Sequence, residues 1–361
     1  MRKSIVCKAM GILMAVTMMA TGCASQSVKK PAETAAPKAE GTQAAGGETT
    51  AAAPAAQAEY NLIAAHVSTT EHSFQAGLEA FKREAEEKSG GRISVEIHPN
   101  GELGGNEDEL VQKMATGTVD VIISAPSFMA QSVKEADILS LPYLFSDTEH
   151  WKKCMDGEPG QQISKLVEEE SGIFHVLGYF KDGVRSMYTI KPVEKLEDMK
   201  DMKFRIQNSP TQIAFWSALG VQPTFVAFNE IYQALQNGVI DGAENSYSQI
   251  AQQKHYEVCK HITETEHDVA TRFLLISADK YNSMPEDLRA VIDEAGKVAT
   301  REQRDFDDQL GDKYKKEMAD AGITFHQIDK QQLIDLTETI REEKAKELGL
   351  DEMYKTMKEL K

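Results

Sequence analysis

Hydrophobic and polar positions follow two alternating rhythms along the chain. Between residues 60 and 126, short apolar runs with period two alternate with segments in which apolar residues recur every three or four positions. The first helical segment, 72–91, places Phe74, Leu78 and Phe81 on one stripe and ends in two glycines. The resulting order of strand, helix, strand, helix and strand is typical of a parallel sheet flanked by helices.

A second series of the same kind covers residues 201–245. Ser209 and Pro210 are the expected cap and first-turn proline of a helix, and Gly220 ends it. The predicted elements are strands at 201–208, 221–228 and 239–245 and helices at 211–220 and 230–238. The pattern therefore predicts two α/β units in one chain.

The last third of the chain is mainly helical in pattern. Pro285 opens a long helical segment that continues past Asp320, and a short strand at 323–328 and a helix from about Lys330 follow. Long helices in this position are expected to bridge two lobes. The predicted fold class is α/β, with a parallel-type sheet and flanking helices in each lobe.

Composition narrows the class of ligand. The chain has 361 residues, of which 41% are hydrophobic, and this is enough for two cores of ordinary size. Its formal net charge of −17 argues against nucleic-acid binding, which needs a basic surface. An anionic ligand would therefore need a local basic site against the overall field.

The N-terminal residues have the pattern of a targeting segment. Arg2, Lys3 and Lys8 precede an apolar run that is too short to span a bilayer, and small residues stand directly before Cys23. This resembles a bacterial lipoprotein signal, so residues 1–22 are predicted to be a signal peptide and Cys23 to be lipidated. The alternative is ordinary cleavage with an incidental cysteine. Residues 23–58 are predicted to be a disordered tether that anchors the folded part to the membrane.

The other chemically distinctive residues have plain interpretations. Cys154 and Cys259 could form a disulfide, but two free buried thiols are favoured. His255, His261 and His267 recur every six residues, which on a helix would place them on different faces. No metal and no cofactor are expected.

The carboxyl ends of the predicted strands indicate where a ligand would bind. In the second series these ends bear Gln207, Asn208, Phe228 and Asn245, and Arg205 lies on the face of Gln207, two residues earlier. In the first series they bear the polar runs 66–68, 98–100 and 124–127, and His72 begins the adjacent helix. Amides, hydroxyls, an aromatic ring and an arginine suit a hydroxylated anion.

A second arginine occurs where the chain passes from one unit to the other. The apolar stretch 178–190 contains Arg185. Two arginines near one cleft would suit a carboxylate or a phosphate, because a guanidinium matches both geometrically. On residue type alone, both Arg185 and Arg205 more often pair with an internal acid or face solvent.

Three long motifs resemble one family. The stretches 101–121, 139–145 and 197–246 are similar to the glycine-rich block, the short inter-motif segment and the core signature of TRAP-transporter solute-binding proteins of the dicarboxylate-binding type. The resemblance covers about residues 60–361. It implies a two-lobed periplasmic-binding-protein fold with a hinge, a location outside the cytoplasm, and delivery of an organic acid to a TRAP permease driven by an ion gradient.

The resemblance also implies roles for particular residues. The family's arginine for the ligand carboxylate matches Arg205, and a second ligand arginine matches Arg185. The asparagine of its DGxEN motif matches Asn245, and the aromatic residue before its second signature helix matches Phe228.

The run RIQNSP is similar to members that bind hexuronates or related sugar acids. This adds Gln207 and Asn208 as ligand contacts, with Glu71 and His72 as hydroxyl partners from the first lobe. A C4-dicarboxylate or another sugar acid remains the alternative ligand.

The lobes are expected to be discontinuous in sequence. The first is predicted at 59–182 plus about 270–310, and the second at about 183–269 plus 311–361. The protein is expected to be a monomer. It is not expected to be an enzyme, because the sequence contains no G-x-S-x-G, P-loop or H-E-x-x-H motif. The rival interpretations are an extracytoplasmic hydrolase and a sensor lobe or adhesin.

Overall fold

The computed structural model describes residues 58–360, which belong to one compact unit. The predicted signal peptide, the predicted lipidation at Cys23 and the tether apart from residue 58 lie outside the described residues. Within 58–360, no helix is both long enough and apolar enough to cross a bilayer.

One mixed sheet joins all the strands of the described part of the chain. Its strands are β1 (Tyr60–Ala65), β2 (Ile93–His98), β3 (Val121–Ser124), β4 (Phe174–Thr189), β5 (Lys203–Ile206), β6 (Gln222–Phe225), β7 (Gly242–Ser246), β8 (His261–Ser277) and β9 (Thr324–His326). Their order is β2-β1-β3-β8-β4-β7-β5-β6, and β9 pairs with β8. The α/β class is therefore confirmed.

Two parallel groups of strands correspond to the two predicted series. β1 pairs in parallel with β2 and β3, and β5 pairs in parallel with β6 and β7. Between these groups lie β4 and β8, which are 16 and 17 residues long and run antiparallel to each other. The description of each lobe as parallel is therefore incomplete, because β8 pairs antiparallel with β3 of the first group and β4 pairs antiparallel with β7 of the second.

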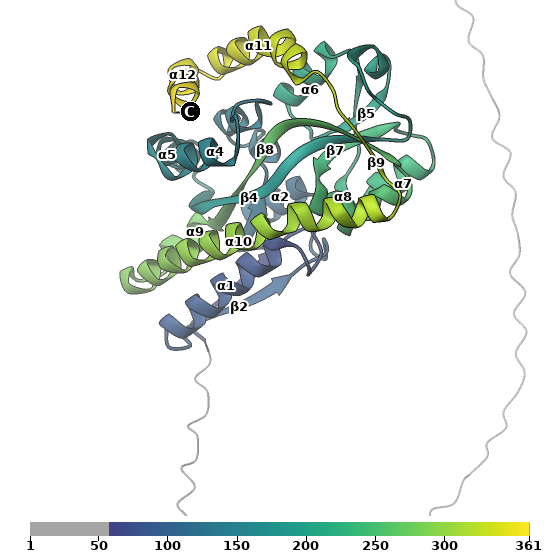
Figure 1. Cartoon of the computed structure of the whole chain (residues 1–361). Helices are drawn as coiled ribbons and strands as arrows, with labels where there is room; N and C mark the ends of the chain where they lie inside the picture. Colours follow the sequence, from purple (N-terminus) through teal and green to yellow (C-terminus); the bar gives the residue numbers. More distant parts are fainter. Residues whose placement is uncertain (1–57, 361) are drawn as a thin grey trace, which may run out of the picture. The chain divides into compact units, whose positions relative to one another are not determined.

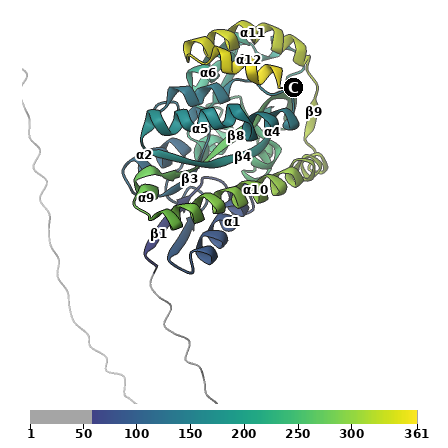
Figure 2. The same ribbon diagram turned by 90° about the vertical axis from the view of Figure 1, so that its left-hand side faces the viewer.

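The helices cover the sheet and connect its two groups. Their bounds are α1 (Ser73–Lys88), α2 (Glu107–Ala115), α3 (Pro126–Met129), α4 (Thr148–Asp156), α5 (Glu158–Ser171), α6 (Pro210–Ala218), α7 (Ile231–Gln236), α8 (Tyr247–Gln252), α9 (Ala278–Asn282), α10 (Glu286–Asp320), α11 (Lys330–Glu347) and α12 (Asp351–Glu359). The predicted long helix is α10, which runs alongside α1 and past β4 to α8 (Figure 1). Near the C-terminus, α11 packs on α6 and α12 packs on α5 (Figure 2).

Each parallel group has a hydrophobic core of its own. In the first, Phe74 and Phe81 of α1 pack with Ile292 of α10 against the sheet. In the second, Phe204 of β5 packs against Trp216 of α6, with 4.6 Å between the ring centroids. A third cluster extends between them along β4 and β8. Each group of strands is therefore packed against helices of its own, and the two long strands β4 and β8 join the groups.

The prediction for the cysteines is confirmed, whereas the one for the histidines is not. Cys154 and Cys259 are both free and buried, which confirms the favoured interpretation. The helical spacing assumed for the histidines is wrong, because His261 and His267 lie on the strand β8 and His255 on the short 3-10 helix His255–Glu257. Among residues 58–360, no group of three potential ligands is placed to hold a metal ion.

Candidate functional site

A small enclosed cavity lies between residues of the two series. It is lined by Val67, Asn106, Glu107, Phe128, Arg185, Arg205, Gln207, Phe228, Asn245, Gln249 and Arg272. The space among these side chains is about 280 Å³, with room for the centre of about one water molecule. A sugar-sized ligand therefore requires the walls to move apart before it enters.

Five of the eight predicted ligand residues line this cavity: Arg185, Arg205, Gln207, Phe228 and Asn245. The other three do not. Asn208 is half-buried beside the start of α6, and Glu71 is exposed.

His72 is buried, but its ring is engaged elsewhere. Its Nδ1 accepts a hydrogen bond from the backbone N–H of Phe74 and caps α1, and its Nε2 lies 3.3 Å from Asp182. The capping role fixes the ring, which does not line the cavity.

Arg205 is a buried cation that has no acidic partner among the residues the structure describes. Its Nε donates to the backbone carbonyl of Val226 at 3.0 Å, whereas its Nη2 has no hydrogen-bond partner and is buried. Among residues 58–360, no carboxylate oxygen lies within 4 Å of its guanidinium. The alternation predicted from the sequence explains the placement, because Phe204 and Ile206 point into the core and leave Arg205 on the opposite face.

The electrostatic surroundings of Arg205 reflect this lack of a partner. Burial lowers its pKa, and the charge of Glu244 offsets only part of this effect. Burial and the nearby charge of Arg205 also lower the pKa of His255 to about 3, so that ring is neutral at physiological pH. A buried, incompletely bonded guanidinium is costly unless an anion completes it.

Arg185 is in the opposite situation. Its Nε and Nη2 donate to the two carboxylate oxygens of Glu244, at 2.5 and 2.8 Å. Burial alone would lower the pKa of Arg185, but Glu244 outweighs it and the pKa is raised. Burial would raise the pKa of Glu244, but Arg185 and His267 outweigh it and hold the pKa at about 2. Arg185 is therefore neutralised within the protein, as residue type alone suggested.

The sequence interpretation missed Glu244 as the partner of Arg185. Its signal was its position: Glu244 directly precedes Asn245 in the DGxEN motif, and the antiparallel pairing of β4 with β7 brings this segment alongside Arg185. That pairing is a long-range feature that the local pattern does not contain.

Two amide side chains are oriented to donate hydrogen bonds into the cavity. The Asn245 Oδ1 accepts from Arg185 Nη1 at 2.8 Å and from the backbone N–H of Ser246 at 3.0 Å. The Gln207 Oε1 accepts from Ser127 Oγ at 2.9 Å. With these oxygens engaged, the NH2 groups are the groups available to a ligand. Together with the ring of Phe228, they suit an anion with oxygen acceptors and an apolar ring face.

The opposite wall bears charged residues that the sequence interpretation did not single out. Glu107, the first residue of α2, accepts a hydrogen bond at Oε2 from the backbone N–H of Ala125, and its Oε1 lies 3.5 Å from Arg272 Nε. Arg272 Nη2 in turn lies 2.9 Å from Asp182. Burial raises the pKa of Glu107 despite Arg272, whereas Arg272 and His72 outweigh burial and lower the pKa of Asp182.

Hydrogen bonds across the cavity hold its walls together. Besides the bond from Ser127 to Gln207, the backbone N–H of Asn229 donates to Gly105 at 3.3 Å, and Gln249 Nε2 donates to Ser68 at 3.0 Å. These polar contacts can exchange for bonds to water when the walls separate. The arrangement is that of a closed binding cleft.

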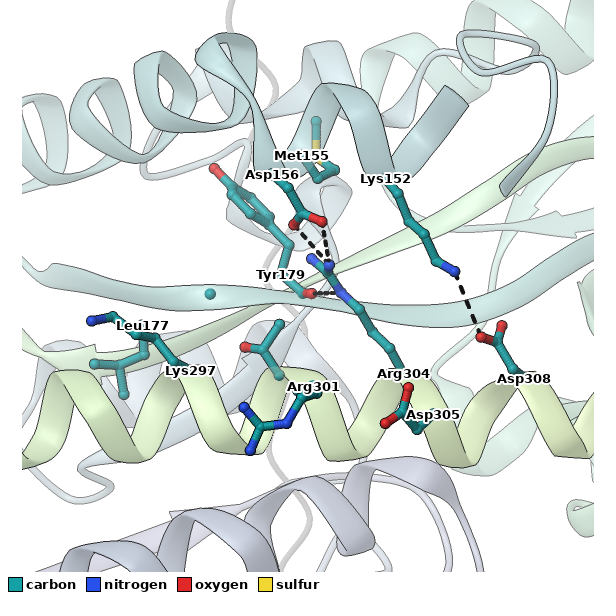
Figure 3. A pocket seen from close by; sticks show the side chains of 12 residues that line it. Lys152, Met155, Asp156, Leu177, Tyr179, Lys297, Arg301, Arg304, Asp305 and Asp308 are labelled. Atoms are coloured by element: carbon teal, nitrogen blue, oxygen red, sulfur yellow. Dashed lines mark hydrogen bonds and ion pairs between the residues drawn. The ribbon is translucent and has the colours of Figure 1, made fainter. Parts of the chain in front are cut away.

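A larger hollow on the surface lacks these features. It lies between α4, β4 and α10 and is open to solvent, with about 970 Å³ of space when the adjoining solvent is included (Figure 3). Figure 3 shows Arg304 directed at Asp156, 2.7 Å away, and Lys152 pointing toward Asp308, 3.8 Å away. These exposed pairs are screened by solvent, and no predicted ligand residue lies there.

Comparison with known proteins assigns the chain to one family. The profile of bacterial extracellular solute-binding proteins, family 7, matches residues 64–347. The chain belongs to this family. The family 7 assignment confirms the predicted resemblance, the location outside the cytoplasm and the prediction that the protein is a solute-binding receptor and not an enzyme.

Similar family 7 proteins have been named for organic acids. The C4-dicarboxylate-binding periplasmic protein DctP of Rhodobacter capsulatus is 32% identical over 266 residues, which is 73% of this chain and 79% of that protein.

Two solved structures of TRAP periplasmic solute-binding proteins are also similar. One from Sulfitobacter sp. NAS-14.1, with bound β-D-galacturonate, has a TM-score of 0.78 at 28% identity, covering 82% of this chain and 99% of that one. One from Pseudomonas putida F1, with bound D-glucuronate, has a TM-score of 0.79 at 27% identity, covering 83% and 96%.

Proposed function

We propose that this family 7 protein captures a hexuronate and delivers it to a TRAP-type secondary transporter. The observation that supports this most directly is Arg205, a buried guanidinium with a free Nη2 and no acidic partner among the described residues. The ligand carboxylate docks on Arg205, and the amides of Asn245 and Gln207 donate to its other oxygens. Arg185 is the residue that orients Asn245, through its bond to the Asn245 oxygen.

Two further observations favour a hexuronate. The bound ligands of the Sulfitobacter and Pseudomonas proteins are uronates. The ring of Phe228 provides an apolar surface beside the amide donors, which suits a sugar ring. The second candidate is a C4-dicarboxylate, which the name of the Rhodobacter relative favours.

Closure of two lobes accounts for capture. The first lobe consists of residues 59–182 and about 270–310, and the second of about 183–269 and 311–361. They turn about β4 and β8, which connect the two groups of strands. We expect a monomer to be sufficient for binding, because residues of both groups of strands within one chain line the cavity.

Calorimetric titration of the folded part with D-galacturonate and D-glucuronate tests the proposal. We expect saturable binding of at least one hexuronate. The melting temperature of the protein should rise with the concentration of that ligand, because the ligand binds the folded state selectively. The ligand should be recovered unchanged. Binding of succinate or malate in preference to both uronates would favour the dicarboxylate alternative, and no binding of any carboxylate would contradict the function.

Lipidation of Cys23 anchors the receptor at the membrane in this proposal. We expect the full chain, expressed in bacteria, to partition with the membrane fraction. The Cys23→Ala variant should be released from the membrane or retain its signal peptide, because the thiol that accepts the lipid is lost. Cell fractionation and metabolic labelling with a fatty acid measure the location and the lipidation of each protein. Cys259→Ala is the control, since that thiol is buried in the folded part. Equal labelling of wild type and Cys23→Ala would rule out the anchor.

A further inference from the structure

We infer that Glu107 makes the cavity selective for acids with a single carboxylate and hydroxyl groups at the other end. The inference rests on the proposed function, because it assumes that the ligand carboxylate docks on Arg205. It concerns the wall opposite Arg205, for which the sequence predicted hydroxyl partners at Glu71 and His72. Those two side chains do not line the cavity, whereas Glu107 does.

The two groups of strands bring different charges to the cavity. At the Arg205 end, Arg185 and Glu244 neutralise each other, so the charge of Arg205 is left over. At the opposite end, Arg272 is shared by two acids, Asp182 at 2.9 Å and Glu107 at 3.5 Å. Asp182 also contacts His72, at 3.3 Å. A second ligand carboxylate would have to compete with Glu107 for Arg272, whose Nε lacks a hydrogen-bond partner among the described residues and has Glu107 as its nearest acid.

Glu107 is also placed to receive a hydroxyl group. Only 4% of its surface is exposed, and it lines the cavity. Within the described part of the chain, its one hydrogen bond is the bond from Ala125 to Oε2, which fixes the carboxyl group and leaves Oε1 with only the longer contact to Arg272. A carboxylate oxygen accepts a hydroxyl proton well but repels another carboxylate.

The chemical consequence is discrimination between a uronate and the corresponding aldarate. Both have one carboxylate for Arg205, but the aldarate has a second carboxylate where the uronate has its anomeric group. Juxtaposed like charges at a buried contact weaken binding strongly, so we expect the wild type to bind D-galacturonate at least about 30-fold more tightly than galactarate.

A purely structural role for Glu107 makes a different prediction. If Glu107 serves only to hold Arg272 and the start of α2, its replacement lowers the melting temperature and weakens every ligand by the same factor. Glu107→Gln preserves the size of the side chain and an oxygen that can accept from Ala125. It removes only the charge, so the ratio of affinities separates the two roles.

The experiment is calorimetric titration of wild type and Glu107→Gln with D-galacturonate and galactarate. The difference in ring form between the two ligands is the same for both proteins and cancels in the comparison. We expect Glu107→Gln to bind galactarate at least about 10-fold better than wild type does, and galacturonate less tightly. Glu109→Gln is the matched control: it lies on the same helix, is exposed, and removes the same charge.

The outcomes separate a failure of the proposed function from a failure of the proposed role of Glu107. If wild type binds no hexuronate, the proposed function fails. If wild type binds galacturonate but Glu107→Gln leaves the galactarate affinity unchanged, or lowers both affinities together, the role of Glu107 is overturned and the function stands. Should Glu107→Gln not fold, the wild-type ratio decides, since equal binding of galactarate and galacturonate contradicts the inference.

Discussion

Replacing Arg205 with methionine is expected to remove most of the hexuronate affinity while leaving the unliganded protein at least as stable as the wild type. Loss of one member of a desolvated charge pair costs about 2–5 kcal/mol, or roughly 30-fold to several-thousand-fold in Kd. Without ligand, however, Arg205 has no acidic partner within residues 58–360, and its Nη2 lacks a hydrogen bond to any of them. An apolar side chain of similar length removes that unfavourable burial.

Calorimetry and thermal denaturation with and without galacturonate measure both effects. The melting temperature without ligand should stay or rise, and the increase on adding ligand should disappear. Arg301→Met is the control, because Arg301 is an exposed arginine of α10 in the surface hollow of Figure 3. Near-normal affinity of Arg205→Met would remove Arg205 from the carboxylate site, and a large loss of stability would show that it has a structural partner.

Replacing Glu244 with glutamine is expected to have the opposite effect on stability. The substitution preserves the shape but leaves the buried charge of Arg185 without its acid, and breaking a buried ion pair in this way costs about 3–5 kcal/mol. The melting temperature should fall by roughly 6–20 °C if each kcal/mol lowers it by about 2–4 °C. An unchanged melting temperature would mean that the pair is replaced by other contacts.

The ion pair of Glu244 with Arg185 also predicts that stability depends on pH. The pKa of Glu244 is lowered from its ordinary 4.5 to about 2 in the folded protein. A carboxyl group with a depressed folded-state pKa contributes stability that is present above pH 4.5 and is lost as the pH falls toward 2. Wild type should therefore lose more stability than Glu244→Gln over this range. Denaturant titrations of both proteins at several pH values measure the difference, and parallel curves would contradict it.

Local pattern was sufficient for the elements that repeat the α/β rhythm. As predicted, Ser209 caps α6 and Pro210 is its first residue, and the long helix α10 begins directly after Pro285. Local pattern was not sufficient for β4 and β8, because their pairing joins residues about 100 positions apart, such as Phe174 and Ser277. The histidines of β8 were consequently interpreted with helical spacing.

In the site, too, local pattern predicted some features and long-range contacts determined the others. Alternation along β5 predicted the face of Arg205, and the part of the chain that the structure describes offers that residue no acidic partner. An arginine is neutralised only if the fold brings a carboxylate next to it. The sequence does not show that the pairing of β4 with β7 brings Glu244 to Arg185. His72 was assigned to the ligand because of its place in the sequence, but its Nδ1 bonds the first turn of α1. Such competition between a cap and a ligand is decided only in three dimensions.

The antiparallel pairing of β3 with β8 has a consequence for biogenesis. Ile122 pairs with Leu275, so the sheet that begins at Tyr60 stays incomplete until more than two hundred further residues have been synthesised. Contacts of such high sequence separation make folding slow. A nascent chain that is slow to become compact remains threadable through a narrow translocation channel, which suits a receptor that works on the far side of the membrane from the ribosome.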